Sequence, residues 1–91
     1  MLVTKDNIGS IDLTKHIVAV FEAPHLFVLV EASGRYSFVS MMLFVDAAWS
    51  VLPERRPCTS IVGCVMHMLD NNRTVIASRS YKELYEFIQN I

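Results

Sequence analysis

Two neighbouring runs near the start of the chain carry apolar residues on both of their faces. The first run is HIVAVFEA, residues 16–23, and the second is LFVLVEA, residues 26–32. Their β-branched and aromatic side chains favour strands. A strand with one face in water alternates apolar and polar residues, whereas a strand covered on both faces does not. The chain must therefore fold so that other elements pack over both faces of a small sheet.

The length of the chain limits how much cover it can supply. Its 91 residues are enough for one domain, residues 1–91, with a core of modest size. The apolar content of 53% and the charged content of 19% indicate a globular chain and exclude a disordered one. Because the chain has only three glycines and three prolines, we expect short turns between its elements.

A β-hairpin is the clearest local prediction. Ser33 and Gly34 separate the second run from a third one, RYSFVSM, residues 35–41. Glycine tolerates the positive φ that a two-residue hairpin turn requires. Pro24 and His25 interrupt the chain between the first two runs, so these runs form separate strands. The segment LVT near the N-terminus could form a further short strand.

The following residues predict a helix and then a second hairpin. Apolar residues at helical spacing, followed by a proline stop, predict a helix over residues 43–52. Residues 59–70 alternate in a pattern that leaves both faces apolar, so we predict a central strand there. Asn71 and Asn72 suit a two-residue turn, and residues 73–79 return as the partner strand.

Ser80 begins the last predicted helix. With Glu83 three residues later it matches a capping box, in which each side chain binds an otherwise unpaired backbone N–H. An apolar stripe at helical spacing should pack on the sheet, and it consists of Tyr81, Leu84, Tyr85 and Ile88. The predicted fold is α+β, mainly antiparallel β-hairpins with two short helices, in the order β-β-β-α-β-β-α.

Charge, cysteine usage and hydropathy narrow the functional classes. The net charge of −1 supplies no global basic field that would draw the chain to nucleic acid. Two cysteines make no disulfide framework and indicate a reduced, intracellular protein. No apolar run approaches the roughly 20 residues that span a bilayer, and the N-terminus lacks an apolar signal core. We therefore expect a cytoplasmic protein without membrane contact.

The sequence indicates neither a metal site nor a catalytic site. Cys58, Cys64 and His67 are of the types that bind zinc, but their C-x5-C-x2-H spacing fits no compact zinc site and lacks a fourth ligand. Cys64 and Ser78 have no adjacent base that a third group would orient. The glycines are too far apart for a phosphate-binding loop. We therefore predict no enzymatic activity, no metal and no cofactor.

The arginines are the remaining candidates for a binding site. Arg55 and Arg56 follow a proline in a predicted loop, Arg73 follows a predicted turn, and Arg79 lies beside Ser78 at the start of the last helix. A helix N-terminus favours an anion, and a guanidinium group holds a phosphate or a guanine edge with two hydrogen bonds. The alternative for each arginine is an ordinary solvated surface side chain.

The order of these segments resembles the LytTR-type DNA-binding domain of bacterial response regulators. IVAVFEAPHLFVLVEASGRY resembles the strand pair of that family, LFVDAAWSVLP its short helix ending in Leu-Pro, and LDNNRTVIASRSYKEL its closing hairpin. These segments cover most of residues 17–88, whereas residues 54–63 depart from the family's central signature. The last hairpin and helix also resemble small FlbD-type flagellar proteins.

The LytTR-type resemblance implies a small transcriptional regulator that reads double-stranded DNA through loops and strand ends. It implies contacts from His25, Ser78 and Arg79, to which we add Arg55, Arg56 and Arg73 as phosphate or base contacts, provided that these groups converge on one surface. The alternative is a non-enzymatic protein-interaction module or inhibitor that acts as a small homo-oligomer, such as a homodimer. It would bind through an exposed strand edge or a methionine-rich face.

Overall fold

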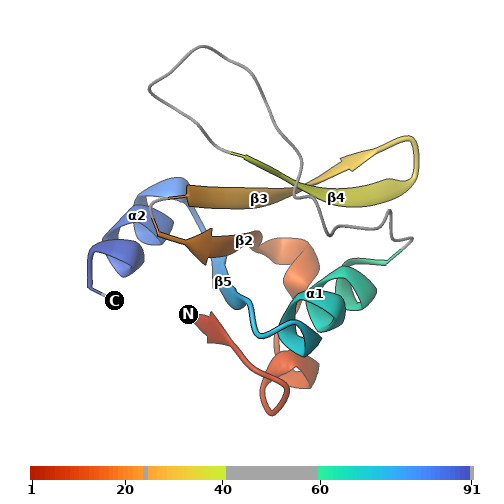
Figure 1. Cartoon of the computed structure of the whole chain (residues 1–91), viewed down its shortest axis with the longest axis horizontal. Coiled ribbons are helices and arrows are strands. Elements are labelled where there is room, and N and C mark those ends of the chain that lie inside the picture. The colour runs from red at the N-terminus through yellow and green to blue at the C-terminus, as the bar shows by residue number, and fades with distance from the viewer. Residues whose placement is uncertain (24, 41–59, 91) are drawn as a thin grey trace.

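The computed structural model of the chain describes residues 1–23, 25–40 and 60–90, and these form one antiparallel sheet with helices on both sides (Figure 1). The strands lie in the order β1-β5-β2-β3-β4. The predicted α+β class is confirmed. The elements are β1 (Leu2–Val3), the 3₁₀ turns η1 (Ile8–Ser10) and η2 (Leu13–Lys15), β2 (Ile17–Glu22), β3 (His25–Ala32), β4 (Arg35–Ser40), α1 (Ile61–Asp70), β5 (Thr74–Ser78) and α2 (Tyr81–Gln89).

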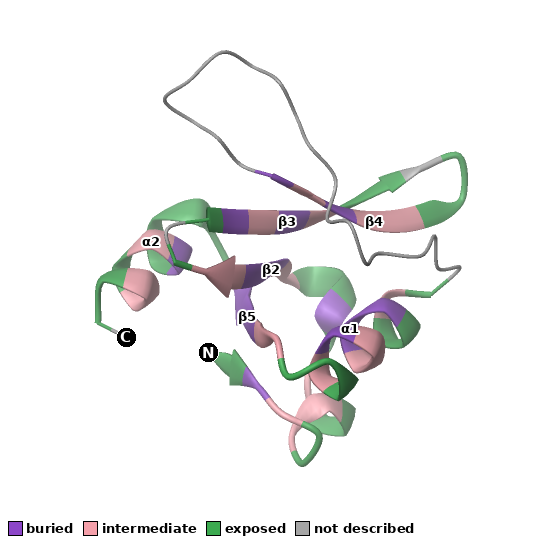
Figure 2. Ribbon diagram, viewed as in Figure 1, coloured by how far each residue is buried: buried purple, intermediate pink, exposed green. Residues whose placement is uncertain are grey.

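Both faces of the sheet are covered, as the two apolar runs predict. On one face, Val18 and Val20 of β2 pack in a core cluster with residues of α1, η2 and β5. On the other face, Ala19 of β2 and Ile76 of β5 pack with α2, of which Leu84 is fully buried. Figure 2 shows buried residues along β5 and β2, and others on β3, β4 and α1.

The predicted hairpin between β3 and β4 is confirmed. Its register runs without a break from Phe27–Ser40 to Ala32–Arg35. Ser33 and Gly34 both have positive φ angles, 53° and 78°, which fit the type I′ turn that matches the twist of the strands. The short strand at the N-terminus is also present, paired with β5.

The predicted strand over residues 59–70 is wrong, because residues 61–70 form helix α1. The segment satisfies two periods at once: its alternation suggests a strand, but its apolar residues also recur at helical spacing. The cap decides between them, since the Ser60 Oγ accepts a hydrogen bond from the Gly63 N–H at 3.0 Å. Cys64, Val65 and Met68 then form the buried side of the helix.

The predicted hairpin turn at Asn71 and Asn72 is wrong as well, because these residues end α1. Asn72 has the left-handed backbone that the sequence predicts, with φ 60°. Its N–H donates to the carbonyl of Leu69 and the N–H of Arg73 donates to the carbonyl of Met68, both at 3.0 Å. This is the Schellman pattern of a helix end rather than a hairpin. β5 follows as predicted, but its strand neighbours are β1 and β2.

Helix α2 confirms the role of Ser80, whose Oγ accepts a hydrogen bond from the Glu83 N–H at 3.2 Å. The apolar stripe is narrower than predicted. Leu84 is fully buried and Tyr85 and Ile88 pack beside it, whereas Tyr81 is 47% exposed. The helix predicted over residues 43–52 lies outside the described residues.

Gly34 provides a test of the hairpin. We expect Gly34→Ala to lower the free energy of unfolding by about 1 kcal/mol, because an L side chain is disfavoured at a left-handed backbone. Gly9→Ala is the matched control: an added Cβ meets nothing within 4 Å at either position, and only Gly34 has a positive φ. Urea unfolding measures both variants, and equal losses would contradict the backbone explanation.

Candidate functional site

The pairing between β2 and β3 leaves out the start of β2 and the end of β3. Their register runs from Glu22–His25 only to Ala19–Val28. β2 continues beside β5 to the pair Ile17–Ser78, and β3 continues beside β4 to the pair Ala32–Arg35. The start of β2 and the end of β3 therefore diverge. We call this opening, formed by residues 16–18 and 29–31, the β2–β3 fork.

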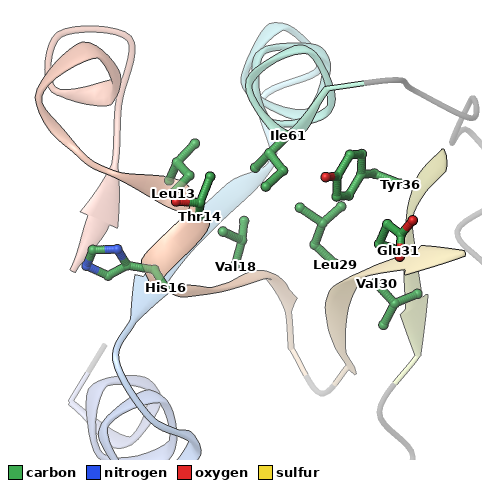
Figure 3. Close-up of a pocket in the computed structure, with 9 residues that line it drawn as sticks. All are labelled: Leu13, Thr14, His16, Val18, Leu29, Val30, Glu31, Tyr36 and Ile61. Atoms are coloured by element: carbon green, nitrogen blue, oxygen red, sulfur yellow. The ribbon is translucent and has the colours of Figure 1, made fainter. Parts of the chain in front are cut away.

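A pocket open to solvent lies at the fork, with an empty volume of about 380 Å³ (Figure 3). Five elements contribute to it, namely η2, β2, β3, β4 and α1. η2, which precedes β2, lies on one side of the pocket, and the first turn of α1 lies on the other. We call it the fork pocket, and its lining consists of Leu13, Thr14, His16, Val18, Leu29, Val30, Glu31, Tyr36 and Ile61.

The fork pocket combines an apolar floor with a few polar groups. Val18 is almost fully buried and forms the floor with Leu29 and Ile61. The Tyr36 ring extends over Leu29 toward Ile61, and Glu31 lies beside it on the neighbouring strand (Figure 3). His16 lies at the opposite end, where its Nδ1 is 2.7 Å from the carbonyl oxygen of Asp12.

Backbone groups from both strands also face the fork. In a two-residue hairpin the residues flanking the turn form a hydrogen-bonded pair, here Ala32 and Arg35, and the direction of the backbone groups then alternates along the strand. The N–H and C=O of Leu29 and Glu31 therefore point away from β4. By the same alternation those of Val18 point toward β3. The last pair, Ala19–Val28, is of the non-hydrogen-bonded kind, so it is held by the flanking residues, including a bond from the Leu29 N–H to the Val18 C=O, and the strands separate beyond it.

Glu31 supplies the negative charge of the fork pocket. Its Oε1 accepts a hydrogen bond from the N–H of Gly34 at 3.0 Å, which holds the carboxylate at the end of the hairpin. Tyr36 lies opposite Glu31 in the register and shares its face of the sheet. Arg35, the residue before Tyr36 on β4, projects from the other face, because successive strand residues alternate. A cationic group of a ligand can therefore approach Glu31 on the pocket side.

The residues expected to contact DNA do not form one surface in the described part of the chain. Arg73 precedes β5 and forms an ion pair with Glu22, and His25 is the register partner of Glu22. Arg79 follows β5 at its other end, six residues and about 20 Å from Arg73. Arg55 and Arg56 lie outside the described residues.

Ser78, also expected at the DNA surface, is fully buried beneath α2 at the end of β5. Of the three residues whose types suit zinc, Cys64 is buried in α1 with its Sγ 3.7 Å from the carbonyl oxygen of Tyr36, and His67 lies three residues further along that helix. Cys58 lies outside the described residues. Within the described ranges, no three His, Cys, Asp or Glu side chains gather as metal ligands would.

Sequence reasoning missed the fork pocket. Its lining comes from five elements, and no spacing in the sequence marks the point where β2 and β3 separate, because both strands remain apolar beyond it. The one usable signal is Glu31, a charged residue at the end of an otherwise apolar run and close to a tight turn.

No family model, curated protein or solved structure matches this chain. The resemblance to LytTR-type and FlbD-type proteins therefore stays a prediction. In the part of the chain that the structure describes, no helix is long and apolar enough to cross a membrane.

The burial of Ser78 leads to a stability prediction. Its Oγ and the hydroxyl of Tyr85 are buried without a hydrogen-bond partner among the described residues. We expect Ser78→Ala to raise the free energy of unfolding by about 1 kcal/mol, because an unpaired buried hydroxyl is destabilising. Ser10→Ala, at an exposed position, is the control and should leave stability unchanged. Chemical denaturation compares the two, and a loss of stability in Ser78→Ala would show that this hydroxyl makes a favourable bond.

Proposed function

We propose that this chain is a cytoplasmic, non-enzymatic protein-interaction module that binds a segment of a partner protein in the fork pocket. The observation that carries the proposal is the early end of the β2–β3 pairing at Ala19–Val28. It leaves an apolar hollow, and it directs backbone hydrogen-bonding groups from two strands into the same opening.

The composition of the fork pocket supports a binding role. Ligand sites are mostly apolar hollows with a few placed polar groups. The floor of Val18, Leu29 and Ile61 meets the first condition, and the Tyr36 ring and the Glu31 carboxylate meet the second. A strand edge adds main-chain hydrogen bonds, which give affinity to many peptide-binding domains.

The charge distribution favours a protein partner over DNA. The net charge is −1, and the pairing of Arg73 with Glu22 uses one of the cations that DNA binding would require. Arg79 is the observation in favour of DNA, since it is exposed beside the first turn of α2, where a phosphate is stabilised. A single exposed arginine gives weaker support than the fork pocket does.

Site-specific photo-crosslinking tests the proposed partner site. We place a photoreactive phenylalanine analogue at Thr14, an exposed residue at the pocket, and in a control variant at Lys82, an exposed residue of α2. We expect a discrete adduct with one host protein at Thr14, unaffected by nuclease, and none at Lys82. An equal adduct at both positions, or an adduct lost on nuclease treatment, would contradict binding at the fork pocket.

Fluorescence anisotropy with a labelled duplex tests the competing function. At a salt concentration of about 50 mM we expect no saturable binding, because the described arginines do not share a surface. Tight binding that falls steeply with salt, and that Arg79→Ala weakens while Lys82→Ala does not, would favour the DNA-binding function and overturn our proposal.

A further inference from the structure

We propose that the ligand of the fork pocket is a short extended peptide carrying an apolar side chain and, two residues further along, a lysine or arginine. This inference rests on the proposed function and specifies the partner segment. The peptide would lie along the end of β3 as an added strand, with its apolar side chain in the fork pocket and its cationic group at Glu31.

The backbone of β3 specifies an extended ligand. Leu29 directs its C=O, and Glu31 both its N–H and its C=O, into the fork beyond the last pair of β2 with β3. Backbone polar groups in partly buried positions require partners, and a strand supplies a donor and an acceptor at every second residue. The part of β3 beyond its last pair with β2 is about 13 Å long, which limits the segment to roughly four residues.

The floor of the fork pocket specifies an apolar side chain. Val18, Leu29 and Ile61 meet there from three different elements, and the Tyr36 ring borders the space above Leu29 (Figure 3). A branched aliphatic side chain removes this apolar surface from water on binding, and each buried CH₂ group contributes about 0.8 kcal/mol to affinity.

Charge complementarity specifies the basic residue. Glu31 is the carboxylate of the lining, and it is exposed on the pocket side of the hairpin. Residues two apart in an extended strand lie on the same side, so a peptide whose apolar side chain enters the pocket beside Leu29 presents the residue two positions away to Glu31. A lysine or arginine at that second position can place its charged end at Glu31 while its methylene groups lie against Tyr36.

Two capped peptides test this inference on the full-length, ¹⁵N-labelled chain. The probe is acetyl-Leu-Val-Lys-Val-amide, and the matched reference peptide has Glu in place of Lys. We expect the probe to shift the backbone amide signals of Val18, Leu29 and Glu31, with a Kd in the millimolar range. The reference should bind about five- to tenfold more weakly, because its carboxylate repels Glu31.

A conservative variant isolates the charge. Glu31→Gln keeps an oxygen that can accept the Gly34 N–H, so the hairpin end is retained, but it removes the charge. In this variant we expect both peptides to bind equally. Glu83→Gln, at an exposed position on α2, is the control and should keep the preference for the probe. Equal binding of both peptides to the unaltered chain would overturn the basic specificity.

Other outcomes separate this inference from the proposed function. No shifts at the fork with either peptide up to about 5 mM would overturn strand addition. If the Thr14 adduct still forms in that case, the protein-binding function stands without strand addition. If neither the peptide shifts nor the Thr14 adduct is seen, the protein-binding function and the peptide inference are both rejected. Fork signals that move when the protein alone is diluted would identify a second copy of the chain as the occupant, and would overturn the peptide assignment.

Discussion

The burial of β2 on both faces is the constraint on which the rest of the structure depends. Three consecutive residues, Val18, Ala19 and Val20, alternate between the two faces of the sheet and are all almost fully inaccessible to water. One face must then be closed by α1 and η2, and the other by α2. Both α1 and α2 lie far from β2 in the sequence. The sheet is therefore complete only after the C-terminal third of the chain has folded onto it and placed β5 beside β2.

The fork pocket lies where this cover becomes uneven. At the centre, β2 pairs with both neighbours and its side chains are buried, but past Ala19–Val28 the β3–β4 hairpin departs from β2. Exposure along β3 follows the pairing: Val28 is 4% exposed, whereas Val30, two residues later on the same face, is 37% exposed. Paired strands twist relative to one another, so a long hairpin beside a shorter strand tends to leave the common sheet. The binding surface is thus a consequence of unequal strand pairing.

Sequence reasoning succeeded where one local pattern had a single structural solution, as in the hairpin at Gly34 and the cap at Ser80. It failed over residues 61–70, which satisfy the strand period and the helix period together. There the deciding signals were the ends of the segment, where Ser60 caps the helix and Asn72 adopts the left-handed backbone that closes it. The fork pocket had no local signal, because pairing length depends on contacts between distant segments rather than on the composition of either strand.

A ligand in the fork pocket would also stabilise the folded chain. Val18 and Leu29 approach each other only because β2 and β3 share the pair Ala19–Val28, so the unfolded chain offers no equivalent site. A ligand that binds only the folded chain stabilises it by an amount set by the ligand concentration and the dissociation constant. The added strand would rejoin the β3–β4 hairpin to β2 through hydrogen bonds. The gain in protection from amide hydrogen exchange should therefore be greatest at the open end of this hairpin, beyond its last pair with β2.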